Sequence, residues 1–215
     1  GVQTCALPIC DLFGFCVAQQ CAEILDENDV AITEFGAGTG ALADTIIRYF
    51  DGKISADNFS YSIIEPSPYL SQRQKNRLSK MNSRLADKIK WYSTCPNEGF
   101  LGVAIANEVF DAMPARRFTI RRGEIKELGV AYDGENFVWE IMECSVIPEL
   151  ILDRMANYPE GYTTEHVERQ GRWFAEFKKF MKRGILLVAD YGYVDQDFFH
   201  LDRCDGTLRC YFKHH

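Results

Sequence analysis

The stretch EFGAGTGALAD, residues 34–44, holds three glycines in a turn between a short apolar run and a segment with helical spacing. Such turns let the backbone approach a ligand closely, and the helix that follows presents unpaired N–H groups. Counted from Gly36, the pattern is G-x-G-x-x-A, a dinucleotide-binding fingerprint. Counted from Glu34, it is E-x-G-x-G-x-G, which fits a loop that binds S-adenosyl-L-methionine (SAM). The turn therefore predicts a cofactor site and leaves two cofactors open.

Strands and helices alternate on both sides of this turn. Residues 30–35 form an apolar run that predicts a buried parallel strand, and residues 41–50 carry apolar side chains at helical spacing. Further strands are predicted at 59–64, 89–92, 102–106 and 185–189, and further helices at 69–81, 149–158 and 166–183, the last with Gly184 as its stop signal. The alternation predicts an α/β fold with a Rossmann-like, mostly parallel, doubly wound sheet.

The pattern of side chains changes after Pro114. Residues 117–142 alternate between apolar and polar side chains and are interrupted by Gly123 and by Asp133–Gly134, which predicts β-hairpins. We therefore expect an inserted β-hairpin and helical element on the substrate side. The expected organisation is a Rossmann-like cofactor-binding core at 11–114, the insertion at 115–165, and a continuation of the core at 166–215.

Polar residues follow four of the predicted strands. In an open α/β sheet, ligands bind outside the carboxyl ends of the strands, so these residues are expected to meet at one edge. Their convergence is a stronger indication of a functional site than the glycine turn alone. They are Glu34 to Gly40, Glu65, the group Asn107, Glu108 and Asp111, and the pair Asp190 and Tyr191.

Two features favour SAM over a nicotinamide dinucleotide. Glu34 lies where an acid can face the amino group of SAM, and no Tyr-x-x-x-Lys motif or strand-end His with a nearby carboxylate indicates hydride transfer. Glu65 suits either cofactor, because a carboxylate there can accept hydrogen bonds from ribose hydroxyls. The residues expected to hold SAM are Glu34, Gly36, Ala37, Gly38, Gly40, Glu65 and Asn107.

The composition argues against several other functions. The chain has 215 residues and a net charge of −7, which argues against broad binding to nucleic acid. No apolar run reaches the ~20 residues that span a bilayer. Residues 1–10, which begin GVQTCALPI, look like a translated sequencing adapter and are left out of the functional argument. The group His200, Cys204, Cys210 and His214 matches no common zinc spacing, so no metal site is expected.

With these residues assembled, the chain resembles the MidA family of SAM-dependent methyltransferases. The resemblance implies a class I methyltransferase core with an inserted β element. Members extend further at both ends, so we expect the chain to be truncated at both ends. Mitochondrial members methylate an arginine of a complex I subunit during assembly, which implies an arginine acceptor on a protein partner. The matching stretches are LFG (12–14), EFGAGTGALA (34–43), IIEPSPYL (63–70), IANEVFDAMPARRF (105–118), GYTTEH (161–166), LLVADYGY (186–193) and GTLRCYFKHH (206–215).

An arginine acceptor requires acids on the acceptor side of the site. Guanidinium is protonated in water, so carboxylates have to orient it and redistribute its charge. We expect Glu108 and Asp111 to grip the acceptor, and Glu165 in GYTTEH is a further candidate. The expected catalytic residues are Asn107, at the junction of cofactor and acceptor, with Glu108, Asp111, Asp190 and Tyr191 around the acceptor.

Two other functions remain alternatives at this point. One is a non-catalytic, methyltransferase-like assembly factor, and the other is an NAD(P)-dependent oxidoreductase. The expected location is the cytoplasm for a bacterial protein and the mitochondrial matrix for a eukaryotic one. No oligomeric state is predicted.

Overall fold

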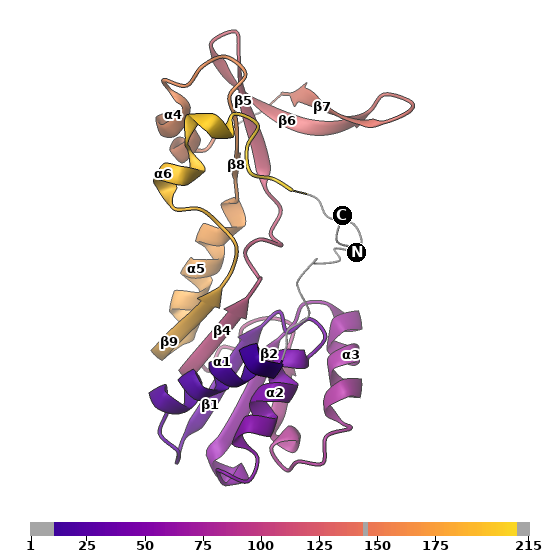
Figure 1. The fold of residues 1–215 in the computed structure, drawn as a ribbon, viewed down its shortest axis with the longest axis vertical. Helices are drawn as coiled ribbons and strands as arrows, with labels where there is room; N and C mark the ends of the chain where they lie inside the picture. Colours follow the sequence, from indigo (N-terminus) through magenta and orange to yellow (C-terminus); the bar gives the residue numbers. More distant parts are fainter. Residues whose placement is uncertain (1–10, 144–145, 210–215) are drawn as a thin grey trace. The chain divides into compact units, whose positions relative to one another are not determined.

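The computed structural model of the chain describes residues 11–143 and 146–209 (Figure 1). These residues form two compact units. The first unit contains residues 11–112 and 173–190, and the second contains residues 113–172 and 191–209 except for the two residues that are not described. The sequence predicts an insertion at 115–165 and a continuation of the core from 166 onward. The structure instead assigns residues 166–172 and 191–209 to the second unit. The adapter-like residues 1–10 lie outside the described residues.

A parallel five-stranded sheet forms the centre of the first unit. Its order is β3-β2-β1-β4-β9, and each strand pairs in parallel with its neighbours. The predicted parallel sheet is therefore confirmed. The strands are β1 (Val30–Phe35), β2 (Phe59–Ile64), β3 (Ile89–Tyr92), β4 (Phe100–Asn107) and β9 (Met181–Ala189).

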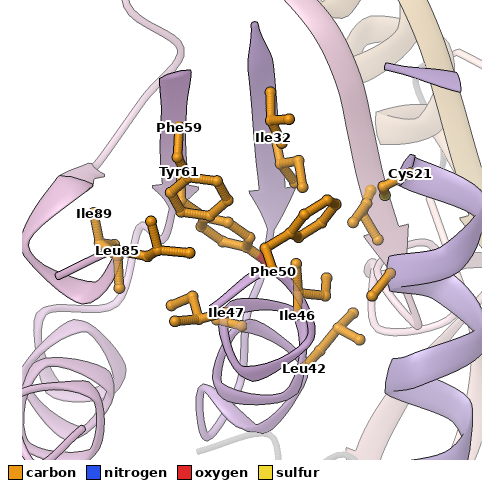
Figure 2. Close-up of a cluster of buried hydrophobic side chains, with 14 of the residues drawn as sticks. Cys21, Ile32, Leu42, Ile46, Ile47, Phe50, Phe59, Tyr61, Leu85 and Ile89 are labelled. Atoms are coloured by element: carbon orange, nitrogen blue, oxygen red, sulfur yellow. The ribbon is translucent and has the colours of Figure 1, made fainter. Parts of the chain in front are cut away.

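Helices α1 and α2 cover one face of this sheet. Figure 2 shows Ile32 of β1 and Tyr61 of β2 pointing toward Ile46 and Ile47 of α2, all in one buried cluster. In the described part of the chain, no helix is both long and apolar enough to cross a membrane. The helices of this unit are α1 (Asp11–Ile24), α2 (Ala41–Phe50), α3 (Pro68–Leu78) and most of α5 (Glu168–Phe180), with short 3-10 turns η1 (Ala56–Asn58) and η2 (Ala86–Lys88).

Helix α5 covers the other face of the sheet. The ring of Phe35, from β1, packs edge to face against the rings of Trp173 and Phe177, with ring-centroid distances of 4.9 Å and 5.8 Å. Phe180 at the end of α5 stacks on Phe100 of β4. Because helices pack on both faces, the sheet is doubly wound, as the alternation of strands and helices predicted.

The predicted helix 166–183 is wrong at both ends. Helix α5 stops at Phe180, strand β9 starts at Met181, and His166 belongs to strand β8 (Thr163–His166). Gly184, expected as a helix stop, lies inside β9 opposite Gly102 of β4. A Cβ on Gly184 would overlap the carbonyl oxygen of Gly102, so glycine is needed there for the close approach of two strands. A local helix-stop pattern could not reveal this long-range contact.

The second unit is built on a four-stranded antiparallel sheet with the order β7-β6-β5-β8. The predicted hairpins are confirmed, with turns at Arg122–Gly123 and at 133–136, whereas β8 was not expected to be a strand. Phe118 and Ile120 of β5 pack against Ile151 and Met155 of α4. The elements are β5 (Arg116–Arg121), β6 (Glu124–Tyr132), β7 (Phe137–Met142), β8 (Thr163–His166), α4 (Glu149–Met155), α6 (Asp195–Phe198) and the 3-10 turn η3 (Leu201–Arg203).

Candidate cofactor and acceptor site

The glycine turn after β1 has a backbone that only glycine adopts readily. Gly36, Gly38 and Gly40 have φ values of +62°, +52° and +77°. A Cβ on Gly38 would meet no heavy atom within 4 Å, so the backbone there borders open space. Gly40 caps the N-terminus of α2, and its N–H donates to the carbonyl of the buried Ala37 at 2.7 Å. The turn therefore offers an accessible backbone in front of a helix N-terminus, as a bound cofactor requires.

Glu65 follows β2 at the same edge of the sheet. Its carboxylate is buried, with 6% of the residue exposed. Oε1 accepts from the Ser67 N–H at 2.9 Å, and Oε2 accepts from Nε2 of Gln74 at 3.0 Å. Each carboxylate oxygen can accept a second hydrogen bond, so Glu65 is held in place and can still accept from ribose hydroxyls.

Glu34 is buried beneath the glycine turn. It is 2% exposed, and the Tyr61 hydroxyl donates to its Oε2 at 2.7 Å. Burial raises the pKa of Glu34 to about 7; the hydrogen bond from Tyr61 opposes this rise, and the charge of Glu65 adds to it. Glu34 therefore has a structural partner on the core side, and its predicted contact with the amino group of SAM stays a prediction.

Gln74 connects the glycine turn with Glu65 and is not among the residues predicted from the sequence. It lies on α3 and is fully buried. Its Nε2 donates to the carbonyl of Gly38 at 3.1 Å as well as to Glu65, and its Oε1 accepts from Nε1 of Trp91 at 3.2 Å. The available signal was a polar residue on the inward stripe of a helix, with leucine four residues before and four residues after it.

The predicted acceptor side begins where β4 ends. Asn107 is the last residue of β4, and Glu108 follows it; both are half-buried. Glu108 has a φ of +49°, and its N–H donates to the carbonyl of Ala189 in β9 at 2.8 Å. A left-handed backbone costs about 1 kcal/mol or more for a residue with a side chain. The bond to β9 holds the chain in this turn and fixes the direction in which Glu108 leaves the sheet.

Asp190, directly after β9, anchors the loop that follows Glu108. Its Oδ2 accepts from the N–H of Phe110 at 2.7 Å and from the N–H of Asp111 at 3.4 Å. Partial burial, and then the charge of Asp190, raise the pKa of Asp111. The structure thus brings the predicted acids of two strand ends together and gives Asp190 a positioning contact that the sequence did not indicate.

The predicted cofactor and acceptor sides are adjacent in the first unit. The side chain of Val109, in the loop after β4, lies 3.5 Å from where a Cβ of Gly36 would be. The glycine turn and the acidic loop are therefore neighbours at the carboxyl edge of the sheet. Tyr191, which is 65% exposed, belongs to the second unit, so its place beside the acceptor stays a prediction.

Glu165 has a different setting in the second unit. It is 5% exposed, and its Oε2 accepts from the backbone N–H of Thr207 at 2.7 Å and from the Thr207 hydroxyl at 3.1 Å. Nε of Arg117 lies 3.3 Å from Oε1, and the guanidinium stacks on Trp139. Arg117 is therefore not a solvated strand position, because its partner Glu165 is buried and the side chain of Arg117 is only 14% exposed.

The expectation of no metal site concerned four residues near the C-terminus. Cys210 and His214 lie outside the described residues. Among residues 11–143 and 146–209, no three His, Cys, Asp or Glu side chains gather in a way that could hold a metal ion.

Comparison with known proteins places this chain in a family. A crystal structure from Burkholderia thailandensis, described as a "likely methyl transferase" bound to S-adenosyl-homocysteine, superposes with a TM-score of 0.84 at 29% identity and covers 96% of this chain and 54% of that chain. A second structure from the same organism gives a TM-score of 0.83 at 30% identity, covering 95% of this chain and 55% of that chain.

Curated relatives come from animals. The zebrafish (Danio rerio) protein arginine methyltransferase NDUFAF7, mitochondrial, is 27% identical over 187 residues, which cover 75% of this chain and 44% of that protein. The Drosophila melanogaster homologue is 23% identical over 230 residues, covering 95% of this chain and 51% of that protein. The chain thus spans about half the length of these relatives. The family described as "Putative S-adenosyl-L-methionine-dependent methyltransferase" matches residues 16–215, so the chain belongs to that family, and SAM is its cofactor, as expected from the strand ends.

Proposed function

We propose that the protein is a protein-arginine N-methyltransferase. The observation that carries this proposal is the acidic loop of Glu108 and Asp111, anchored by Asp190 and in contact with the glycine turn through Val109. Carboxylates at this position suit a cationic acceptor. The names of the animal relatives support arginine as the acceptor.

The cofactor side of the proposal rests on the residues that fit SAM. The glycine turn, through Gly36, Gly38 and Gly40, gives backbone access, and Glu65 offers a fixed carboxylate for the ribose hydroxyls. Bound SAM supplies a methyl group that its sulfonium makes electrophilic. Asn107, at the end of β4, stands between the cofactor residues and the acidic loop in the sequence and is proposed to lie at their junction.

The acceptor residues have three tasks in this mechanism. Glu108 and Asp111 orient the guanidinium and balance its charge, so that one nitrogen is directed at the methyl carbon. One of these carboxylates accepts the proton that this nitrogen gives up, and the raised pKa of Asp111 suits it to that role. Asp190 keeps the loop in place by holding the backbone N–H of Phe110.

The partner and the location follow the same relatives. We propose a protein substrate, and a mitochondrial location if the source is eukaryotic, as the names of the animal relatives state for those proteins. For a bacterial source, we propose the cytoplasm. Methylation of a complex I subunit remains part of this proposal, and a non-catalytic assembly factor is the outcome that a methylation experiment would reveal instead.

The test is methylation with labelled SAM. The full chain is incubated with a lysate of its source, and labelled proteins are digested and analysed by mass spectrometry for methylated side chains. Glu108→Gln is compared with Glu98→Gln, a matched control at an exposed glutamate before the opposite end of β4. We expect methylarginine, lost roughly 100-fold in Glu108→Gln and unchanged in the control.

Three results would contradict the proposal. Label on another residue type would remove arginine as the acceptor. Binding of SAM without any transfer would favour the assembly factor. Equal labelling by Glu108→Gln and the wild type would remove Glu108 from the catalytic residues.

A further inference from the structure

Gln74 is a polar side chain at an inward position of α3. It is 0% exposed and lies between Leu70 and Leu78, which occupy the same stripe of the helix four residues to either side. A buried amide without partners costs several kcal/mol, roughly 2–7 depending on the reference state. An apolar residue would fill this position without that cost, so packing alone does not account for a glutamine there.

The side-chain hydrogen bonds of Gln74 lead to the cofactor side. Its Nε2 donates to the Gly38 carbonyl at 3.1 Å and to Oε2 of Glu65 at 3.0 Å, and its Oε1 accepts from Nε1 of Trp91 at 3.2 Å. A Cβ on Gly40 would lie 3.5 Å from Cα and Cγ of Gln74, so α3 also packs against the glycine turn.

The partners of Gln74 fix the direction of its amide. The Gly38 carbonyl can only accept and the Trp91 indole N–H can only donate, so the NH₂ group must face Gly38 and the oxygen must face Trp91. With the amide in this direction, its second hydrogen is directed at Glu65. A glutamate at this position would lack these donors, and a flipped amide would lose all three bonds. The network therefore specifies glutamine and holds the Glu65 carboxylate at a set angle to the glycine turn.

We infer that Gln74 is a positioning residue for SAM, which locks the Glu65 carboxylate and the glycine turn into one geometry and thereby sets how strongly the ribose hydroxyls are recognised. Gln74 itself touches no ligand, because it is fully buried. The inference rests on the proposed role of Glu65 at the ribose. A carboxylate that accepts from hydroxyls gains from a fixed orientation, because less freedom is lost when the ligand binds.

The experiment measures recognition of the ribose. Calorimetric titration of the full chain with S-adenosyl-homocysteine and with its 2′-deoxyribose analogue gives the ratio of the two dissociation constants. This ratio is measured for the wild type, for Gln74→Met, and for Gln72→Met as a matched control. Gln72 lies on the exposed side of the same helix, where it donates to Asn76.

We expect the wild type and Gln72→Met to bind the ribose ligand roughly tenfold more tightly than the analogue, as one hydrogen bond to a charged group allows. In Gln74→Met, the ratio is expected to drop to about twofold. A general loss of stability would weaken both ligands equally and leave the ratio unchanged, so the ratio separates positioning from folding.

The possible results distinguish a failure of the proposed role of Glu65 from a failure of the inference about Gln74. A wild-type ratio near one would remove Glu65 from the ribose, and with it the proposed cofactor geometry on which the inference rests. A wild-type ratio near ten that Gln74→Met retains would overturn the role of Gln74 alone. If Gln74→Met does not fold, Trp91→Phe decides, since it removes one donor to Gln74 and leaves Glu65 and Gly38 untouched. The expected ratio for Trp91→Phe is about threefold to fivefold, and an unchanged ratio would refute the inference.

Discussion

Replacing Glu34 by glutamine should stabilise the protein at neutral and higher pH, with an effect that disappears below pH 4.5. Glu34 is 2% exposed, and its Oε2 accepts a hydrogen bond from the Tyr61 hydroxyl. Glutamine has the same shape, and its amide oxygen can accept that bond. The substitution therefore removes the cost of a buried charge with little change in packing.

The size and sign of the effect follow from the pKa of Glu34. Burial raises this pKa from 4.5 to about 7, and a pKa difference of one corresponds to about 1.4 kcal/mol, so the ionised form costs about 3 kcal/mol. Below pH 4.5 the carboxyl is protonated in both folded and unfolded chains, and nothing is lost. As the pH rises from 4.5 through 7, the folded state loses this stability, and above 7 the loss is constant.

The assay is urea unfolding of the wild type and Glu34→Gln at unit steps from pH 4 to pH 9. The variant is expected to be more stable than the wild type by an amount that grows between pH 4.5 and 7 and then levels near 3 kcal/mol. Glu27→Gln, at an exposed glutamate, is the control, and its difference from the wild type should not change with pH in this way. If the stability difference between Glu34→Gln and the wild type is the same from pH 5 to pH 8, the raised pKa of the buried Glu34 carboxyl is refuted.

Three further predictions concern the glycine turn, the acidic loop and the second unit. Gly40→Ala, at a φ of +77°, should cost about 1 kcal/mol of stability and weaken SAM binding. Gly52→Ala, at a φ of +74° outside the candidate site, should cost stability alone. Equal SAM dissociation constants for the two variants in calorimetry would contradict this. Asp190→Ala should lower kcat about tenfold with little change in SAM binding, and unchanged single-turnover rates would show that its bond to the acidic loop does not matter. Glu165→Ala should cost about 3 kcal/mol of stability and speed hydrogen exchange at Thr207, because the Arg117 guanidinium and the Thr207 N–H lose their acceptor. Exchange protection of Thr207 equal to that of the wild type would speak against this.

Local sequence patterns predicted most elements of the parallel sheet. The strand at 30–35 and the helix at 41–50 have the bounds that were expected, since an apolar run, a glycine turn and a helical stripe are adjacent in the chain. The strands at 59–64 and 89–92 agree equally well. Helix α1, in contrast, is not predicted. Gly184 fits a helix-stop pattern locally, but its actual constraint comes from Gly102, 82 positions away in the chain.

The sequence by itself determined the parallel-sheet fold, the family and the strand ends at which the candidate site lies. Periodicity and turn chemistry are local, and in a parallel sheet they also decide which residues reach the carboxyl edge. Only the tertiary structure decided what those residues touch: Glu34 pairs with Tyr61, Asp190 holds the backbone of Phe110, and Gln74 joins the glycine turn to Glu65. These contacts join positions from 9 to 80 residues apart. They form because a buried polar group without a partner is costly, and which groups are buried depends on the three-dimensional fold, which no local pattern encodes.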